Sequence, residues 1–207
     1  LHWAIHDEAK VRLLLSKGAN VNATQVQGRT PLYLAAMLGN GTQTMHLLLT
    51  RGADPNLASV NGQTPLMQAA ARGNVEGMQL LIERGANVNS KDGAGETALM
   101  AACTNGNARA VQFLIDQGAD VKVRSKRNET ALGFAATAGV QASVEMLLAK
   151  GADVNVRNFR GYSPLMFAAG SDAMPAGIIR LMLDKGADAS FTGDYDAARR
   201  YLNLGFY

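Results

Sequence analysis

The sequence has a single cysteine among its 207 residues, so no internal disulfide framework can form. It has no apolar run near the roughly 18 residues that a membrane-spanning helix requires. We therefore expect a soluble protein that does not engage a membrane, with the cytoplasm as the favoured compartment. Charged residues make up 18% of the chain, below the roughly 25% usual for globular proteins. The net charge of +3 is too small to indicate a nucleic acid as partner.

Two short strings recur along the chain at a nearly constant interval. One is GQTPLMQAAARGN at residues 62–74, and related strings begin at Gly28, Gly95, Asn128 and Gly161. The Thr or Ser of each copy stands at 30, 64, 97, 130 and 163, so successive copies are 34, 33, 33 and 33 residues apart. The second string, Gly-Ala-Asn or Gly-Ala-Asp, keeps this interval from Gly18 to Gly186. A fixed period of roughly 20 to 50 residues indicates one elongated stack, here of about six units, without an interior domain boundary.

The copy that contains GQTPLMQAAARGN predicts two short helices. Gly62 supplies the positive φ of a tight turn, and Thr64 can cap the helix that we expect over residues 65–72. Gly73 ends that helix, and a second helix with apolar residues on one face is expected over residues 75–83. Isolated helices need about 12 to 15 residues to persist in water, so these helices must pack on neighbouring copies.

This pattern resembles the ankyrin repeat family, whose unit is a turn followed by two antiparallel helices over about 33 residues. The resemblance covers residues 1 to about 190 and rests on the five openings and the six Gly-Ala-Asn/Asp closings. It implies an all-α fold, an ankyrin-type solenoid of about six stacked turn-helix-helix repeats over residues 1–193. Leu1 lies inside the recurring string, so we expect the first repeat to be truncated at its N-terminus and an upstream segment to be missing.

The chain departs from the family pattern at several places. Asn128 replaces a turn glycine, which is tolerable because Asn enters the left-handed region readily. Two extra residues around 171–175 should reshape the loop between the last helices. The family's usual His after the Leu survives only as His2, and the matching positions hold Tyr33, Met67, Met100, Gly133 and Met166. We interpret the three methionines as packing residues, with the alternative that part of this stripe lines a binding groove.

Three features resemble ligand or reaction sites without meeting their requirements. His2 and His6 have the helical spacing of two zinc ligands but lack a third ligand nearby. Cys103 stands where other copies have alanine, so we interpret it as a small buried hydrophobe rather than a nucleophile. The stretch KDGAGET at 91–97 lacks the spacing and the lysine of a phosphate-binding loop. We therefore predict a protein that is not an enzyme, with no catalytic residue, no metal and no cofactor.

The resemblance implies that a protein or peptide partner is held by the turn tips and by the exposed ends of the first helices. The candidate partner-binding residues at these positions are Arg29, Arg72, Lys126, Arg127, Phe159, Arg160 and Tyr162. The last two copies offer the richest set, because Tyr and Arg are over-represented among residues that dominate interface energetics. We expect the strongest contact patch there, for an acidic or aromatic-bearing protein segment.

Alternatives to this interface stay open. Lys126 and Arg127 are equally consistent with a solvated turn. The basic residues near 122–127 leave nucleic-acid binding as a second function, which a steep salt dependence would reveal. The chain is also consistent with a regulatory module of a larger polypeptide, because one scaffold serves many unrelated partners.

Residues 194–207 leave the repeat pattern and contain Tyr195, Tyr201, Phe206 and Tyr207. We interpret this segment as a cap over the apolar face of the last repeat, which solenoids need at their ends. The alternative is a tethered peptide that docks in a concave groove, either its own or that of a second copy, which would allow self-association.

Overall fold

The computed structural model describes residues 1–170 and 175–190 of the chain. Within these residues the regular elements are eleven helices, without a β-strand. In chain order they are α1 (Glu8–Ser16), α2 (Pro31–Ala36), α3 (Thr42–Thr50), α4 (Pro65–Ala71), α5 (Val75–Glu83), α6 (Ala98–Thr104), α7 (Ala108–Asp116), α8 (Ala131–Ala138), α9 (Gln141–Ala149), α10 (Pro164–Ala169) and α11 (Ala176–Asp184). The expected all-α fold is confirmed. The expected loop change near 171–174 and the segment 194–207 lie outside the described residues.

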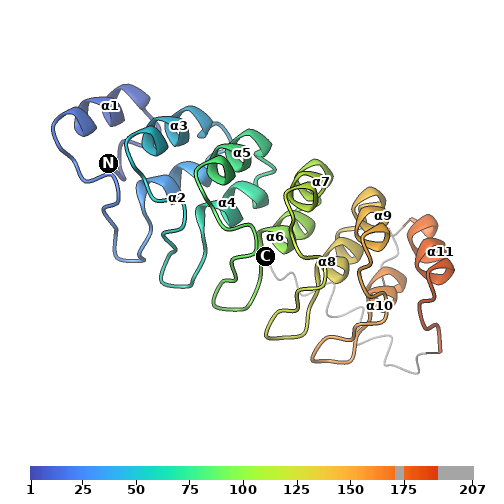
Figure 1. The fold of residues 1–207 in the computed structure, drawn as a ribbon. Coiled ribbons are helices and arrows are strands. Elements are labelled where there is room, and N and C mark those ends of the chain that lie inside the picture. The colour runs from blue at the N-terminus through green and yellow to red at the C-terminus, as the bar shows by residue number, and fades with distance from the viewer. Residues whose placement is uncertain (171–174, 191–207) are drawn as a thin grey trace.

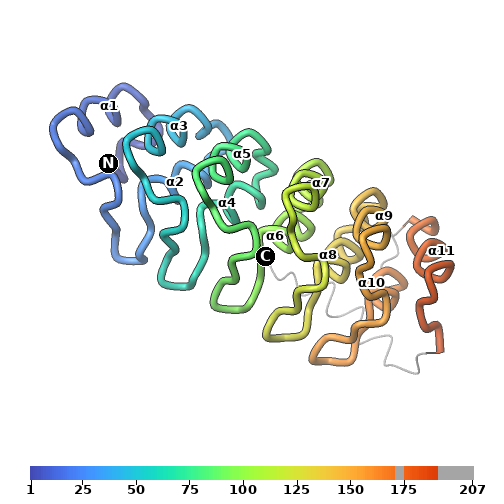
Figure 2. Tube along the Cα trace, viewed as in Figure 1, coloured from blue at the N-terminus to red at the C-terminus, as the bar shows by residue number. Residues whose placement is uncertain are grey.

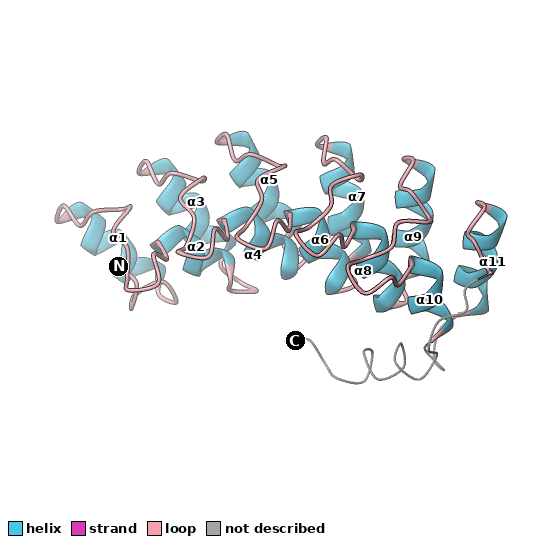
Figure 3. Cartoon of the chain, turned by 90° about the horizontal axis from the view of Figure 1, so that it is seen from below, coloured by secondary structure: helices cyan, strands magenta, loops and turns pink. Residues whose placement is uncertain are grey.

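The helices form two layers along one elongated stack (Figure 1). Seen from below, the odd-numbered helices make up one layer and the even-numbered helices the other (Figure 3). Neighbours within a layer pack on each other, as α4 does on α6 and α5 does on α7. Each even-numbered helix also packs on the odd-numbered helix that follows it. Every repeat is therefore supported by the repeats before and after it.

A buried Thr or Ser starts the first helix of each complete repeat. Its hydroxyl oxygen accepts a hydrogen bond from the backbone N–H three residues later, which satisfies a donor that the helix itself cannot. These caps are Thr30, Thr64, Thr97, Thr130 and Ser163, with N···O distances of 3.1 to 3.4 Å. Pro31, Pro65 and Pro164 fill the first helical position, where their missing N–H needs no partner.

Residues in the left-handed region end the helices and close the turns, as the sequence predicted. Gly62 and Gly73 have φ of 77° and 66°. Asn128, which stands where other copies have a turn glycine, has φ of 57° and is the one non-glycine residue with positive φ in the described part of the chain. Its Nδ2 donates a hydrogen bond to the Arg157 carbonyl oxygen at 2.6 Å. The asparagine therefore adds a link to the following turn that glycine would lack.

Small side chains allow the helices of one layer to approach closely. The fully buried ones include Ala35, Ala36, Ala69, Ala70, Ala102, Cys103, Ala135, Ala136 and Ala168, each with 0% exposure. The leucine that follows each helix cap is also buried, from Leu32 to Leu165. Ala169, which the sequence pattern pairs with Ala168, is partly exposed. A single core cluster runs through the stack from Ala4 to Ala187.

Asparagines in the segments that connect one repeat to the next form a ladder that the sequence reading missed. Asn89 Nδ2 donates to the Gly118 carbonyl oxygen at 3.1 Å, and Asn89 Oδ1 accepts from the Asp120 N–H at 2.9 Å. The same two bonds are made by Asn22, Asn56 and Asn155. Lys122 occupies this position in the remaining segment, and an ammonium group cannot accept an N–H. We refer to the paired bonds as the asparagine clamp.

We predict that Asn89→Ala lowers the free energy of unfolding by about 1–3 kcal/mol, because two inter-repeat hydrogen bonds are lost at roughly 0.5–1.5 kcal/mol each. Urea unfolding followed by circular dichroism measures the change. The matched control is Lys122→Ala, at the equivalent position without a clamp, for which we expect little change. Equal losses in the two variants would contradict a role for the clamp.

Gly133→Ala should stabilise the protein by about 0.5–1 kcal/mol, because glycine disfavours a helix relative to alanine. An added Cβ would meet only Thr130 Oγ1, at 3.7 Å, an ordinary contact. Gly139 at the end of the same helix has φ of 70°, so Gly139→Ala should destabilise instead. Thermal unfolding compares the two, and a lower melting temperature for Gly133→Ala would show that this reading of α8 is wrong.

Candidate partner-binding surface

The turn tips form a continuous row along one edge of the stack (Figure 2). Each tip donates a backbone N–H to a carbonyl oxygen of the preceding tip. These bonds run from Val60 to Gln27 at 3.0 Å, Gly93 to Asn61 at 2.7 Å, Lys126 to Ala94 at 2.8 Å and Phe159 to Arg127 at 2.8 Å. The spacing between neighbouring tips is thus set by the backbone, and side chains at the tips are presented in a fixed register.

Side chains at the start of the later turns hold each tip in shape. Asn158 Oδ1 accepts hydrogen bonds from the backbone N–H groups of Arg160 and Tyr162, at 3.0 and 3.1 Å. Ser125 and Asp92 do the same for their own turns. Such turns are ordered before any partner binds, which reduces the conformational entropy lost on association.

Four of the predicted partner-binding residues come together at two adjacent tips. The guanidinium carbon of Arg127 lies 5.8 Å from the ring centroid of Phe159, and that of Arg160 lies 5.2 Å from the same centroid. Phe159 is 55% exposed, and Lys126 is exposed beside Arg127. We refer to Lys126, Arg127, Phe159 and Arg160 as the tip patch. Its two halves come from consecutive connecting segments.

The other three predicted residues do not join this cluster of exposed side chains. Tyr162 is half-buried, and its ring packs edge-on against Phe167 with centroids 5.8 Å apart. Arg29 belongs to the first complete turn, where it stacks on the Tyr33 ring at 5.6 Å. Arg72 is exposed at the C-terminal end of α4. Arg29 and Arg72 are therefore separate from the tip patch, whereas Tyr162 lies in the same turn as Phe159 with its side chain half-buried.

The methionine stripe is part of the core. Met67, Met100 and Met166 are exposed by 5%, 1% and 5%, so the alternative that the stripe lines a binding groove is wrong. The sulfur atoms of Met67 and Met166 each accept the backbone N–H of their own cap residue at 3.5 Å. A thioether is small and polarizable enough to fill the space under the turn and meet this donor.

Acidic side chains lie next to the tip patch, a feature that sequence reasoning missed. Burial raises the pKa of Glu96 above its usual value, and the negative charges of Asp92 and Glu129 raise that pKa further. The Arg127 guanidinium opposes this shift. No local pattern in the sequence indicates this grouping, because Glu96 and Glu129 come close only through the stacking of consecutive repeats. The surface therefore presents both signs of charge within two repeats.

His2 and the KDGAGET turn, which resembled parts of ligand sites, make structural hydrogen bonds. Residues 2–6 form turns rather than a helix, so His2 and His6 do not share a helical face, and His2 Nε2 contacts the Arg29 carbonyl oxygen at 3.0 Å. In the KDGAGET turn, the Gly93 and Gly95 N–H groups already donate to backbone carbonyl oxygens. In the described part of the chain, no three His, Cys, Asp or Glu side chains are grouped to hold a metal ion.

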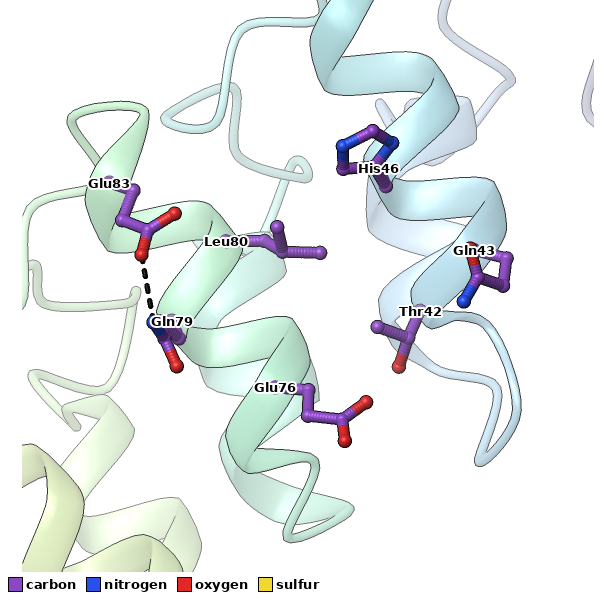
Figure 4. A pocket seen from close by; sticks show the side chains of 7 residues that line it. All are labelled: Thr42, Gln43, His46, Glu76, Gln79, Leu80 and Glu83. Atoms are coloured by element: carbon purple, nitrogen blue, oxygen red, sulfur yellow. Dashed lines mark hydrogen bonds between the residues drawn. The ribbon is translucent and has the colours of Figure 1, made fainter.

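A shallow hollow of about 290 Å³ lies between α3 and α5 in the odd-numbered layer (Figure 4). Its lining is mostly polar, with Leu80 as the one aliphatic side chain. The residues are Thr42, Gln43, His46, Glu76, Gln79, Leu80 and Glu83. Gln79 Nε2 donates to Glu83 Oε1 at 2.8 Å, so part of this polar lining is satisfied internally. A hollow as open and shallow as this one does not enclose a ligand in the way that small-molecule sites usually do.

The geometry defines a helical solenoid that presents an ordered row of turn tips. A family model for ankyrin repeats (3 copies) matches residues 1–59, 34–125, 89–158 and 117–192. The chain belongs to the ankyrin repeat family, whose repeats are generally protein–protein interaction modules and typically non-enzymatic. No curated protein matches the chain. None of the described helices has both the length and the apolar character needed to cross a membrane.

We predict that Cys103 resists thiol reagents in the folded protein. Its side chain is 0% exposed, and burial raises its pKa to about 12, so the thiol stays protonated at about pH 8, whereas the thiolate is the reactive form. Iodoacetamide labelling followed by mass spectrometry should show slow modification of native protein and rapid modification in denaturant. Equal rates in the two conditions would contradict the buried position.

Proposed function

We propose that this ankyrin repeat chain binds a protein partner through the tip patch, and that the partner presents an acidic segment to it. The observation that carries this proposal is the placement of Arg127 and Arg160 on the exposed ring of Phe159. Arginine and aromatic residues that cluster in this way are enriched at the energetic centres of interfaces.

The chemistry of the patch favours carboxylates. A guanidinium that stacks on an aromatic ring keeps its N–H edge available, and this planar edge matches a carboxylate in a bidentate arrangement. Arg127 makes no ion pair with any residue that the structure describes, and it is exposed. Its charge acts on the nearby Glu96 without forming an ion pair, so an acidic side chain of the partner would supply a direct one.

Nucleic-acid binding is the second candidate, supported by the positive charge of Lys122, Arg124 and Lys126. Two observations favour the acidic protein segment over it. Arg124 already pairs with Asp153 at 3.7 Å. The carboxylates of Glu96 and Glu129 also lie beside the patch, where they would repel a continuous polyphosphate backbone more strongly than a single acidic side chain that contacts the arginines alone.

The test is a triple variant in which Arg127, Phe159 and Arg160 are all replaced by alanine. We expect this variant to bind a partner isolated from the native host at least about tenfold more weakly, because interface centres of this kind contribute roughly 2 kcal/mol or more. Isothermal titration calorimetry with the purified partner measures the affinity. A weak salt dependence would support an acidic protein segment, and a steep one would support nucleic acid.

The matched control removes two exposed arginines and one exposed apolar tip residue elsewhere, as Arg51→Ala, Arg84→Ala and Val60→Ala together. We expect its affinity to stay within about twofold of the original protein, because few interface residues contribute much to binding. If both triple variants retain full affinity, the tip patch is not the binding site.

A further inference from the structure

The joints between successive connecting segments differ in their polar links. We refer to the contact between segments 117–130 and 150–163 as the distal joint. Every other joint in the described stack has an asparagine clamp, but at the distal joint Lys122 takes the clamp position. The stem of Lys122 reaches the neighbourhood of Gly151 without replacing the two lost hydrogen bonds.

Some side-chain interactions between the two segments remain at the distal joint. One lies close to the tips, and another is weak. Asn128 donates to the Arg157 carbonyl oxygen at 2.6 Å, beside the tip. Arg124 and Asp153 form an ion pair at 3.7 Å, with both side chains more than half exposed, and such surface pairs contribute little to stability. The side of this joint nearest the second helices has no counterpart of the clamp.

Two buried polar atoms without a hydrogen-bond partner flank the same joint. They are Ser143 Oγ in α9, on a residue with 0% exposure, and Asn158 Nδ2 in segment 150–163, on a residue with 7% exposure. The preceding joint avoids both, because Ala110 stands in place of the serine and Ser125, whose hydroxyl accepts the N–H groups of Arg127 and Glu129, stands in place of the asparagine. An unsatisfied buried polar atom costs more stability than a typical hydrogen bond contributes.

The helix between the two segments, α8, also has a destabilising residue, in addition to the missing clamp and the two unpartnered atoms. Gly133 stands in this helix where the first helices of the neighbouring repeats have Met100 and Met166, both buried. Glycine both disfavours the helix and leaves out the thioether that packs beneath the turn. Four independent departures from the repeat pattern therefore lie within residues 122–158.

We propose that the distal joint opens before the other joints of the described stack, so that the described residues from 150 onward detach while residues 1–130 remain folded. The stability of a repeat protein is approximately a sum of repeat terms and nearest-neighbour interface terms. Partial opening therefore occurs where the interface term is smallest. The four departures place that minimum at the distal joint.

Opening at this joint takes the tip patch apart. Lys126 and Arg127 lie on one side of the joint, and Phe159 and Arg160 lie on the other. The stacking of Arg127 on Phe159 exists only while the joint is closed. This regulatory consequence rests on the proposed function. A partner that contacts both halves binds only the closed form and therefore stabilises it by mass action.

Four equivalent backbone amides report on the joints one by one. They belong to Val60, Gly93, Lys126 and Phe159, each of which donates to the preceding tip. Hydrogen exchange of these amides, measured by NMR on the whole chain, should be at least about tenfold faster at Phe159 than at Gly93, a ratio that corresponds to about 1.4 kcal/mol. Val60 belongs to the joint nearest the N-terminal end, so it controls for fraying. Equal exchange at Phe159, Gly93 and Val60 would overturn the proposal.

Substitutions then test the cause. Lys122→Asn restores the clamp and Ser143→Ala removes an unpartnered hydroxyl, so each should slow exchange at Phe159 by about fivefold to tenfold while Gly93 stays unchanged. Asn89→Lys removes the clamp one joint earlier, with Lys122 left in place, and should speed exchange at Lys126. If neither Lys122→Asn nor Ser143→Ala slows exchange at Phe159, the assigned cause is wrong and the proposal fails.

A separate measurement distinguishes the joint from the binding function. A short poly-glutamate peptide, used as an acidic probe, should slow exchange at Phe159 in the original protein and leave it unchanged in the Arg127→Ala variant. Fast exchange at Phe159 that the probe does not alter would support the joint and contradict its regulation by an acidic ligand. Uniform exchange together with tight binding of the probe would support the proposed function and overturn the joint.

Discussion

Each helix of this protein depends on the repeats on either side of it. The described helices have 6 to 9 residues, well below the roughly 12 to 15 that an isolated helix needs in water. Alanines without exposed surface, such as Ala69 and Ala135, let the next helix approach closely enough to cover the apolar side. Each repeat is therefore stabilised by its contacts with adjacent repeats. A turn tip cannot be displaced unless one of these contacts also changes.

The sequence predicted what depends on local chemistry. The helix expected over residues 75–83 is α5 with the same bounds, and the caps and turn glycines lie where their residue types indicated. Contacts between repeats were not predictable in the same way. The asparagine clamp joins residues about 30 positions apart, and the stacking of Arg127 on Phe159 needs the register between two tips. The residue types of Met67 and Tyr162 are compatible with either a buried or an exposed position. Only the packing of the folded chain shows which of the two each side chain occupies.

In the row of turn tips, backbone groups support the fold, whereas the exposed side chains are available to contact a partner. Backbone hydrogen bonds align the tips, so their side chains are free to vary without loss of register. At the distal end this freedom produces a basic and aromatic patch next to the half-buried carboxylate of Glu96. Adjacent patches of opposite sign favour one orientation of a charged partner, because the reversed orientation would set like charges against each other.

The joint that we propose to be weak and one half of the tip patch lie in the same connecting segment, residues 117–130. Where the tips become basic, the connecting segments also depart from the residues that stabilise the stack, and Lys122 shows both effects in one side chain. Its ammonium adds positive charge two residues before Arg124, but it cannot make the hydrogen bonds of the asparagine that it replaces. Departures from local rules tend to gather at functional sites, where recognition competes with stability. An asparagine at this position would strengthen the joint and remove a positive charge from the segment that carries half of the patch.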